Sequence, residues 1–271
     1  MPETVVIPPL AQSSRIASRG WKKLEGRMNS LTAKYAVAEG HLTSLVAQAV
    51  IAGTLADPKE RRRLKDRIRR VLKELDDDGR RDGREMVDDA YRLGARIAKA
   101  EPVGPINRQG IALLQRNLAG RLSQATTHVG RRTDDVFRRE GLRVAAETLG
   151  RVGQEAATQQ MVRRLQKEGV TAFVDTQGRR WGLERYAAMA LTTVTSEAIF
   201  QGTTNNMLMR GFDLVTVSNT PSPCSRCVSY DGRTYSLTGT EPTYPRLDVV
   251  FPLHPGCDHF VLPSPKGLHR A

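Results

Sequence analysis

The sequence predicts a mainly α-helical protein, in which a long helical N-terminal region is followed by a small α+β C-terminal module. Two observations predict this fold class. Apolar residues recur three and four positions apart through most of the first 170 residues, as they do along the buried face of a helix. Eight of the fourteen prolines and all three cysteines fall after residue 210, where short alternating segments and turns replace the helical pattern.

Three regions follow from this division. Residues 1–20 are expected to form an extended N-terminal arm, because prolines at positions 2, 8 and 9 oppose a helix. Residues 21–170 are expected to be helical and basic, and residues 171–271 to form the C-terminal module. The apolar positions of the expected helices are Trp21, Leu24, Met28, Leu31 and Tyr35; Leu42, Leu45, Val46 and Ala49; Leu64, Ile68, Val71, Leu72 and Leu75; Met86, Ala90, Leu93 and Ile97; Ile111, Leu114, Leu118 and Leu122; and, over roughly 132–168, Val136, Val144, Leu149, Val152, Met161 and Leu165.

A helix start is predicted at Asp57-Pro58. Asp57 can cap the helix, Pro58 fits its first turn, and Glu60 stands where it would complete a capping box. The prolines at 102 and 105 are expected to end the helical pattern that begins at Asp57-Pro58.

The chain is basic, with a net charge of +13, and the excess is confined to residues 1–210, because residues 211–271 hold five basic and five acidic residues. No apolar run approaches the roughly 20 residues that span a bilayer, so no membrane contact is expected. The first residues lack the layout of a signal peptide, which predicts synthesis in the cytosol. Aromatic residues make up only 5% of the chain, which argues against a surface that stacks single-stranded bases.

The segment 59–73 is the densest in positive charge, with nine basic residues against Glu60 and Asp66. One interpretation is a helix that contacts nucleic-acid phosphates. The other is a solvated helix with ion pairs between neighbouring turns, and the acidic residues that follow at 74 and 76–78 favour it. The candidate nucleic-acid-binding residues are Arg61, Arg62, Arg63, Lys65, Arg69 and Arg70.

The C-terminal module is expected to begin with a hairpin. Residues 171–175 alternate like a strand, Gly178 supplies a turn, and Arg180-Trp181 starts the return strand. A helix over about 183–210 then ends at Gly211, and residues 212–217 alternate as a further strand. This helix packed on that strand would give the module its core.

The cysteines lie in two short clusters with histidines. Cys224-Ser225-Arg226-Cys227 is followed, after 26 intervening residues, by His254-Pro255-Gly256-Cys257-Asp258-His259. Tetrahedral zinc takes four Cys or His ligands, commonly as two close pairs, so the pattern predicts a Zn²⁺ site. Its expected ligands are Cys224, Cys227, His254 and Cys257; His254 is favoured because its spacing to Cys257 repeats the CxxC spacing, and His259 is the alternative fourth ligand.

Other interpretations of the clusters are a redox CxxC and a catalytic zinc with Asp231 or Asp258 as base. The proline-rich surroundings disfavour a redox pair, and the sequence contains no HExxH motif or other recognised catalytic constellation. A structural zinc is therefore expected. A module with eight prolines should bury little apolar surface, and zinc binding can supply folding free energy on the order of 10 kcal/mol.

The C-terminal third resembles tailed-phage minor capsid proteins: the phage minor capsid protein 2 family and the head-morphogenesis family named after phage Mu protein F. The matching residues are Trp181, Tyr186, Gly211–Ser218, Cys224–Cys227, Asp231–Gly239, Tyr244-Pro245 and His254–His259, in order and at matching spacing. The sequence differs from the family pattern at Asp258, where the family usually has arginine.

The resemblance implies a structural virion component, present in several copies and associated with the portal or the major capsid protein. It would be made in the host cytoplasm and would lie in the capsid interior or at the portal vertex, where packaged double-stranded DNA is a further expected partner. The alternative function is a zinc-dependent hydrolase or nuclease that acts during packaging or ejection. A third interpretation is a host zinc-binding regulator of DNA.

Overall fold

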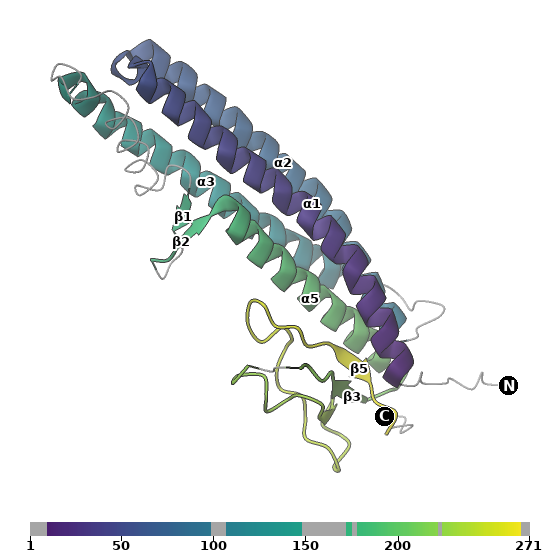
Figure 1. Ribbon diagram of the computed structural model, residues 1–271. Coiled ribbons are helices and arrows are strands. Elements are labelled where there is room, and N and C mark those ends of the chain that lie inside the picture. Colours follow the sequence, from purple (N-terminus) through teal and green to yellow (C-terminus); the bar gives the residue numbers. More distant parts are fainter. Residues whose placement is uncertain (1–9, 99–106, 148–171, 175–177, 222–223, 267–271) are drawn as a thin grey trace. The chain divides into compact units, whose positions relative to one another are not determined.

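The computed structural model describes residues 10–98, 107–147, 172–174, 178–221 and 224–266, and it is mainly helical (Figure 1). The elements are α1 (Leu10–Ile51), a 3₁₀ turn η1 (Thr54–Ala56), α2 (Pro58–Ile97), α3 (Arg108–Glu147), β1 (Ala172–Val174), β2 (Arg180–Gly182), α5 (Leu183–Met209), β3 (Leu214–Val217), β4 (Thr234–Ser236) and β5 (Val261–Pro263). The predicted fold class, mainly α with a small α+β portion, is confirmed at this level.

The N-terminal arm expected over residues 1–20 is wrong for its second half, because α1 begins at Leu10. The prolines that suggested the arm lie in residues 1–9, outside the described residues, and no proline occurs within α1. Ser13, the fourth residue of α1, is buried, and its hydroxyl donates a hydrogen bond of 3.2 Å to the carbonyl of Ile97. A tertiary contact therefore fixes the start of this helix.

The helices predicted over 111–122 and 132–168 form one continuous helix as far as Glu147. Residues 148–168 of the second prediction lie outside the described residues. The start of α2 is confirmed: the Asp57 carboxylate accepts a hydrogen bond of 2.7 Å from the Lys59 N–H. The capping box is only half formed, because the Asp57 N–H donates to the Thr54 carbonyl, and the Glu60 carboxylate pairs with Arg63 instead.

The described chain divides into two compact units, each assembled from separate stretches of sequence. Unit 1 contains residues 1–28, 83–118 and 189–271, and unit 2 contains residues 29–82 and 119–188. Helices α1, α2, α3 and α5 therefore each contribute one part to each unit. The boundary expected from the sequence at residue 170, between the helical region and the C-terminal module, stays a prediction.

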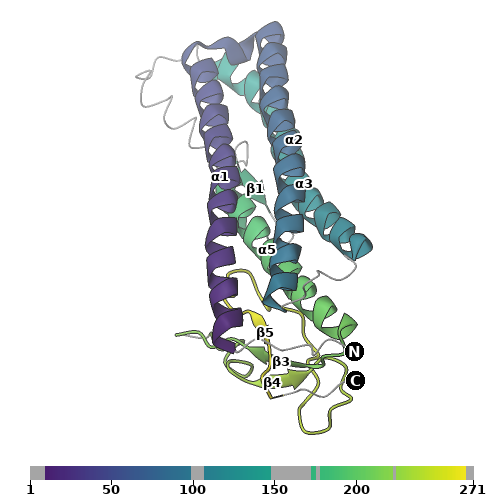
Figure 2. The same ribbon diagram turned by 90° about the vertical axis from the view of Figure 1, so that its right-hand side faces the viewer.

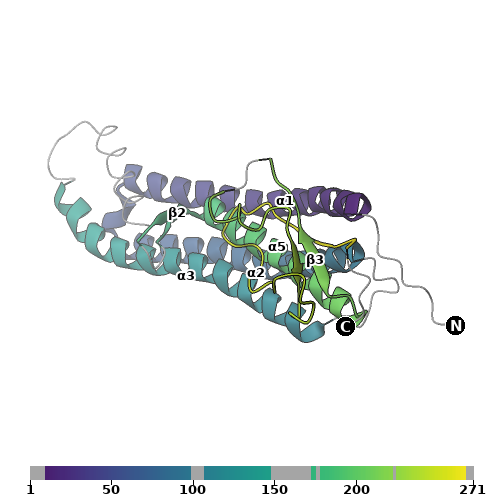
Figure 3. The same cartoon turned by 90° about the horizontal axis from the view of Figure 1, so that it is seen from below.

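In unit 2, parts of α1, α2 and α3 run alongside one another (Figure 3). They meet at Gly79, where an added Cβ would lie 2.5 Å from the Tyr35 hydroxyl oxygen and 3.2 Å from a Leu122 methyl. Ion pairs join the helices at their edges: Lys34 lies 2.7 Å from Asp82, and Lys65 lies 3.3 Å from Asp134. The apolar positions predicted from helical spacing are mostly buried here: Leu31, Tyr35, Leu42, Leu45, Val46, Leu64, Ile68, Leu72, Leu75 and Leu122.

The predicted hairpin is present in unit 2. Strands β1 and β2 pair antiparallel with Phe173 opposite Trp181, and Gly178 in the turn has a φ of 76°. That positive φ is why glycine suits the turn. The indole of Trp181 meets the Tyr186 ring edge to face at 6.3 Å, in the first turn of α5.

In unit 1, α2 and α5 approach each other backbone to backbone. A Cβ on Gly94 would lie 2.2 Å from the Ile199 carbonyl oxygen, and one on Gly202 would lie 2.1 Å from the Tyr91 carbonyl oxygen. The Thr203 hydroxyl adds a hydrogen bond between the two helices, donating to the Gly94 carbonyl at 3.2 Å. These two glycines therefore set the distance at which the helices pack.

Helix α5 ends where it was predicted to, at Gly211 with a φ of 73°, and leads into β3. Strand β3 is the centre of a three-stranded antiparallel sheet with the order β4-β3-β5 (Figure 2). The residues around this sheet bury more apolar surface than their proline content suggested. Their core consists of Ala98, Met207, Phe212, Val215, Val217, Cys227, Tyr235, Leu247, Phe251, Cys257 and Val261.

No helix within the described ranges combines the length and the apolar character that crossing a lipid bilayer would require.

Candidate metal centre

The two Cys/His clusters predicted from the sequence are each built on a tight turn. The Cys224 carbonyl accepts hydrogen bonds of 2.9 Å from the N–H groups of Cys227 and Val228. In the second cluster the Cys257 N–H donates to the His254 carbonyl at 3.2 Å, and Gly256 between them has a φ of 79°. The first turn brings the Cys224 and Cys227 sulfurs within 4.8 Å of each other, and the second turn joins His254 and Cys257 through a backbone hydrogen bond, so the equal spacing of the two motifs corresponds to two similar turns.

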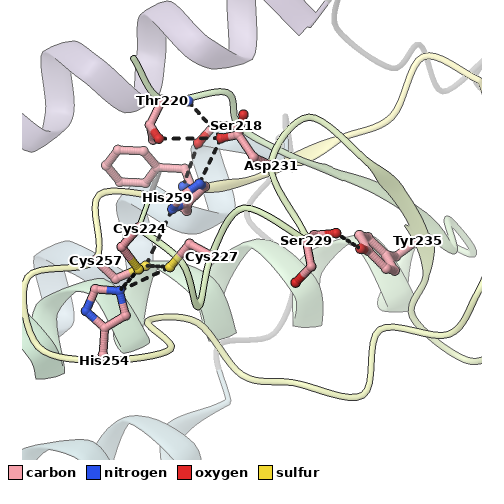
Figure 4. A network of polar contacts seen from close by, with 11 residues as sticks. Ser218, Thr220, Cys224, Cys227, Ser229, Asp231, Tyr235, His254, Cys257 and His259 are labelled. Carbon is pink, nitrogen blue, oxygen red and sulfur yellow. Dashed lines mark hydrogen bonds and ion pairs between the residues drawn. The ribbon is translucent and has the colours of Figure 1, made fainter. Parts of the chain in front are cut away.

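All five predicted donor side chains come together (Figure 4). The ligand atoms of Cys224, Cys227 and His254 lie within 4.8 Å of one another, and so do those of Cys227, Cys257 and His259. Cys227 belongs to both groups. Three residues of the predicted set, Cys224, Cys227 and His254, fall in the first group, and the fourth, Cys257, falls in the second group with His259, the alternative ligand.

The His259 ring is held by a carboxylate on its far side. Its Nε2 lies 2.9 Å from an Asp231 carboxylate oxygen, and its Nδ1 lies 3.6 Å from the Cys257 sulfur. The same Asp231 oxygen accepts a hydrogen bond of 2.8 Å from the Thr220 N–H. A carboxylate that accepts the second N–H of an imidazole fixes the tautomer in which the other nitrogen is free to bind a metal.

The electrostatics of this cluster differ between its inner and outer members. Burial raises the pKa of the Cys227 thiol to about 12, whereas a hydrogen bond with Cys227 lowers the pKa of the exposed Cys224 thiol to about 7. Burial also raises the pKa of Asp231, but hydrogen bonds from Thr220 and His259 outweigh it, so the net shift is downward. Asp231 is therefore a stable anion beside His259.

The donor set matches the chemistry of zinc. Zinc in proteins takes thiolate sulfur and imidazole nitrogen in tetrahedral geometry, and here three sulfurs and two imidazoles converge. Two of these donors, Cys227 and Cys257, lie in the apolar core around the sheet. Thiols that face one another in a core, with histidines beside them, are suited to a shared metal ion.

The carboxylates suggested as bases for a catalytic zinc are placed differently. Asp231 uses one oxygen for His259 and for both the N–H and the hydroxyl of Thr220. Asp258 is exposed to solvent. The role of Asp231 as a partner of His259 was missed from the sequence, because 28 residues separate the two and no motif links them.

The basic segment predicted to bind nucleic acid lies at the start of α2, in unit 2. The predicted alternative, ion pairs along the helix, is present: Arg63 lies 2.5 Å from Glu60 and Arg69 lies 3.6 Å from Asp66. Lys65 and Arg69 also reach Asp134 on α3. The structure adds a groove of about 570 Å³, lined by Pro58, Arg61, Arg62, Lys65, Asp66, Arg69 and Phe137. Arg63 and Arg70 of the predicted set are not among its lining residues.

Comparison with known proteins gives one family. The sequence profile of phage minor capsid protein 2 matches residues 23–251, which include α1 from residue 23 onward, all of α2, α3 and α5, and the first Cys/His cluster, but stop before His254. No curated protein and no solved structure matches the chain. Because the match covers most of the sequence and reaches both compact units, the chain belongs to the phage minor capsid protein 2 family.

Proposed function

We propose that this head protein joins the portal or the major capsid protein of a tailed phage in several copies, after its synthesis in the host cytoplasm. The observation that carries the proposal is the family match over residues 23–251. The structure supports a structural role. Unit 2 has long helices with ion pairs at their edges, and unit 1 has a small three-stranded sheet.

The position of the chain in an intact head tests this proposal. Purified heads of the phage that encodes it are expected to contain several copies at the portal vertex or on the inner capsid surface. The measurement is electron cryomicroscopy of wild-type heads against heads assembled without the gene. Density for the chain in the tail, or identical density in both samples, would contradict the proposal.

Packaged DNA is the second proposed partner. The groove at the start of α2 gathers four cationic side chains, Arg61, Arg62, Lys65 and Arg69, with Asp66 as the acidic member of its lining. Lysine and arginine that contact phosphates release counterions, which makes DNA affinity fall steeply with salt. Asp134 offsets part of this charge through its ion pairs with Lys65 and Arg69, and the Arg61 guanidinium donates to the Leu55 carbonyl at 2.6 Å, so the proposal assigns contact to the four cations of the groove as a group.

A double charge reversal tests the groove. Arg61→Glu with Arg62→Glu is expected to weaken binding of double-stranded DNA and to flatten its dependence on log salt concentration by about 1.8, at roughly 0.9 per phosphate contact. Lys22→Glu with Lys23→Glu makes the same charge change at exposed positions of α1 and is the matched control. Fluorescence anisotropy measures the DNA affinity of both double variants. Equal losses of affinity would show that only the net charge of the protein matters, and would contradict DNA binding in the groove.

We also propose that the Cys/His cluster binds one structural Zn²⁺, in its simplest form through three cysteines and one histidine. When bound, zinc would supply folding free energy to residues 211–266. Elemental analysis is expected to find one zinc per chain, lost in a Cys224→Ser/Cys227→Ser variant. A zinc-free protein that folds with three titratable thiols would contradict this.

A hydrolytic role for the zinc is disfavoured by Asp231, whose Oδ1 is already committed to His259 and Thr220. Zinc-loaded protein is accordingly expected not to cleave DNA. Cleavage that disappears in Asp231→Asn or Asp258→Asn protein with its zinc retained would establish the enzyme instead.

A further inference from the structure

The candidate metal site contains five donor side chains, one more than tetrahedral zinc uses. They differ in burial. Cys227, Cys257 and His259 are 1%, 5% and 5% exposed, whereas Cys224 is exposed and His254 is half-buried. The cluster therefore has an inner set of three donors, Cys227, Cys257 and His259, and a rim pair, Cys224 and His254.

The distances in the inner set match a shared ion. With metal–sulfur bonds of about 2.3 Å and metal–nitrogen bonds of about 2.0–2.1 Å, tetrahedral geometry puts two sulfurs about 3.8 Å apart and a sulfur and a nitrogen about 3.5 Å apart. The Cys227 and Cys257 sulfurs are 3.8 Å apart, and the Cys257 sulfur is 3.6 Å from His259 Nδ1. Two of the three edges of the inner set therefore fit a tetrahedral site, and the third, between the Cys227 sulfur and a His259 ring nitrogen, is no longer than 4.8 Å.

The rim pair is spaced differently. His254 Nε2 lies 3.1 Å from the Cys224 sulfur and 3.1 Å from the Cys227 sulfur. Both distances are about 0.4 Å shorter than the edge that tetrahedral zinc requires. The Cys224 sulfur and His254 Nε2 are thus too close together to be two separate ligands of one zinc ion. Both lie near a single coordination position.

The histidines also differ in how firmly they are held. His259 is oriented by Asp231, which is itself fixed by the Thr220 N–H, and its ring packs 6.1 Å from the Phe251 ring in the core. His254 is oriented by its Nδ1 contact of 2.9 Å with the carbonyl of the adjacent Pro255. Support from separate parts of the chain makes His259 the better preorganised ligand.

We propose that Cys227, Cys257 and His259 are the permanent ligands of the metal, and that Cys224 and His254 are interchangeable occupants of the fourth position. The inference rests on the proposed zinc site and specifies its ligands. Asp231 is a positioning residue, which acts on the metal through His259. Two rim donors for one position give the site a replacement ligand at its solvent-facing side.

The test is metal affinity across single substitutions in the full chain. Cys224→Ser and His254→Asn are each expected to keep one zinc per chain with less than a tenfold loss of affinity, whereas His259→Asn loses about a hundredfold or more. His41→Asn, at an exposed position of α1, is the matched control and should not change affinity. Affinity is measured by competition with a chromophoric chelator, and helix content by circular dichroism.

Cobalt substitution supplies a second measurement, since sulfur-to-cobalt charge-transfer absorption grows with the number of bound thiolates. Cys224→Ser is expected to lower this absorption and to keep the visible bands of tetrahedral cobalt, because His254 enters the fourth position. These spectra and the two rim variants decide the matter even where His259→Asn protein does not fold.

The outcomes separate the two proposals. Wild-type protein without metal would overturn both the zinc site and its ligand assignment. Wild-type protein with zinc would overturn the ligand assignment alone if either rim variant lost the metal, or if His259→Asn protein kept its affinity.

Discussion

The helices of unit 2 and the loops and short strands at 211–266 of unit 1 are stabilised by different means. In unit 2, apolar side chains from three helices fill the interior and ion pairs lie at the edges, as with Tyr35 inside and Lys34 outside. In residues 211–266 polar groups are themselves interior: Asp213, Ser236 and His259 are buried and hydrogen-bonded. The first region is stabilised by many apolar contacts along its helices, and the second by buried polar interactions in addition to its apolar core.

Loss of the metal is expected to produce the largest difference between the two regions. Chelation should unfold residues 211–266, because it removes binding free energy on the order of 10 kcal/mol, and should leave most of the helical circular dichroism intact. Trp21 reports the change, since its ring lies 5.6 Å from Phe260, the neighbour of His259. In a Trp181→Phe variant its emission should shift on chelation; an unchanged emission after verified metal loss would contradict the comparison.

A methyl group at the α2–α5 contact is expected to have the next largest effect. Gly202→Ala puts a Cβ 2.1 Å from the Tyr91 carbonyl oxygen, so a backbone must move, and a loss of about 3 kcal/mol or more in the free energy of unfolding is expected. Gly120→Ala in α3 is the control: nothing lies within 4 Å, and alanine should stabilise that helix by about 0.5–1 kcal/mol. Urea denaturation measures the free energy of unfolding of both variants. Similar values would contradict the close backbone contact between α2 and α5.

The buried carboxylate of Asp213 is expected to make the sheet sensitive to acid. Burial raises its pKa, but hydrogen bonds from the Ser236 hydroxyl and the Thr238 N–H outweigh this, and the net shift is downward. Its contribution is therefore complete above the ordinary aspartate pKa of about 3.9 and is lost as the pH falls through the lower folded-state value. Asp213→Asn should cost about 1.5–3 kcal/mol at neutral pH.

This cost should shrink as the pH is lowered, because the wild-type carboxylate then becomes neutral as well. Thermal unfolding between pH 7 and pH 2 measures the convergence. Asp248→Asn, at an exposed position, is the control and should change stability little at any pH. Parallel curves for wild type and Asp213→Asn would show that the charge of Asp213 is not what stabilises the sheet.

Two buried tyrosines give the smallest and sharpest comparison. Tyr35 and Tyr91 are both 0% exposed, but the Tyr35 hydroxyl has no hydrogen-bond partner among the described residues, whereas the Tyr91 hydroxyl lies 3.2 Å from the Asn205 amide nitrogen. Tyr35→Phe is expected to be neutral or to stabilise by about 1 kcal/mol, and Tyr91→Phe to destabilise by about 1 kcal/mol. Chemical denaturation that ranks the two variants in the opposite order would contradict this.

Helical periodicity made the fold of the first region predictable, since a buried face repeats along the sequence regardless of its partner. Leu64, Ile68, Leu72 and Leu75 were identified in this way and are buried. The start of α1 was not, because prolines nearby outweighed a weak pattern in residues 10–20, and the Ser13–Ile97 hydrogen bond that fixes it spans 84 residues.

At the metal centre the types of donor were predictable, whereas their ranking was not. The spacing from His254 to Cys257 favoured His254, and that spacing does form a turn. What distinguishes His259 is burial, the carboxylate of Asp231 and contact with Phe251, and all three arise from long-range folding. The choice between the histidines remains a prediction that the variants above decide.

The interleaving of the two units has a consequence for synthesis on the ribosome. Every residue of unit 2 has been made once the chain reaches position 188, but unit 1 combines the start of α1 with strands that are translated last. The start of α1 can contact α2 early, since Ser13 bonds to Ile97, but the Trp21 ring must wait for Phe260, the residue before β5, to be made. If translation stopped soon after residue 188, the chain would contain all of unit 2 but only the N-terminal parts of unit 1.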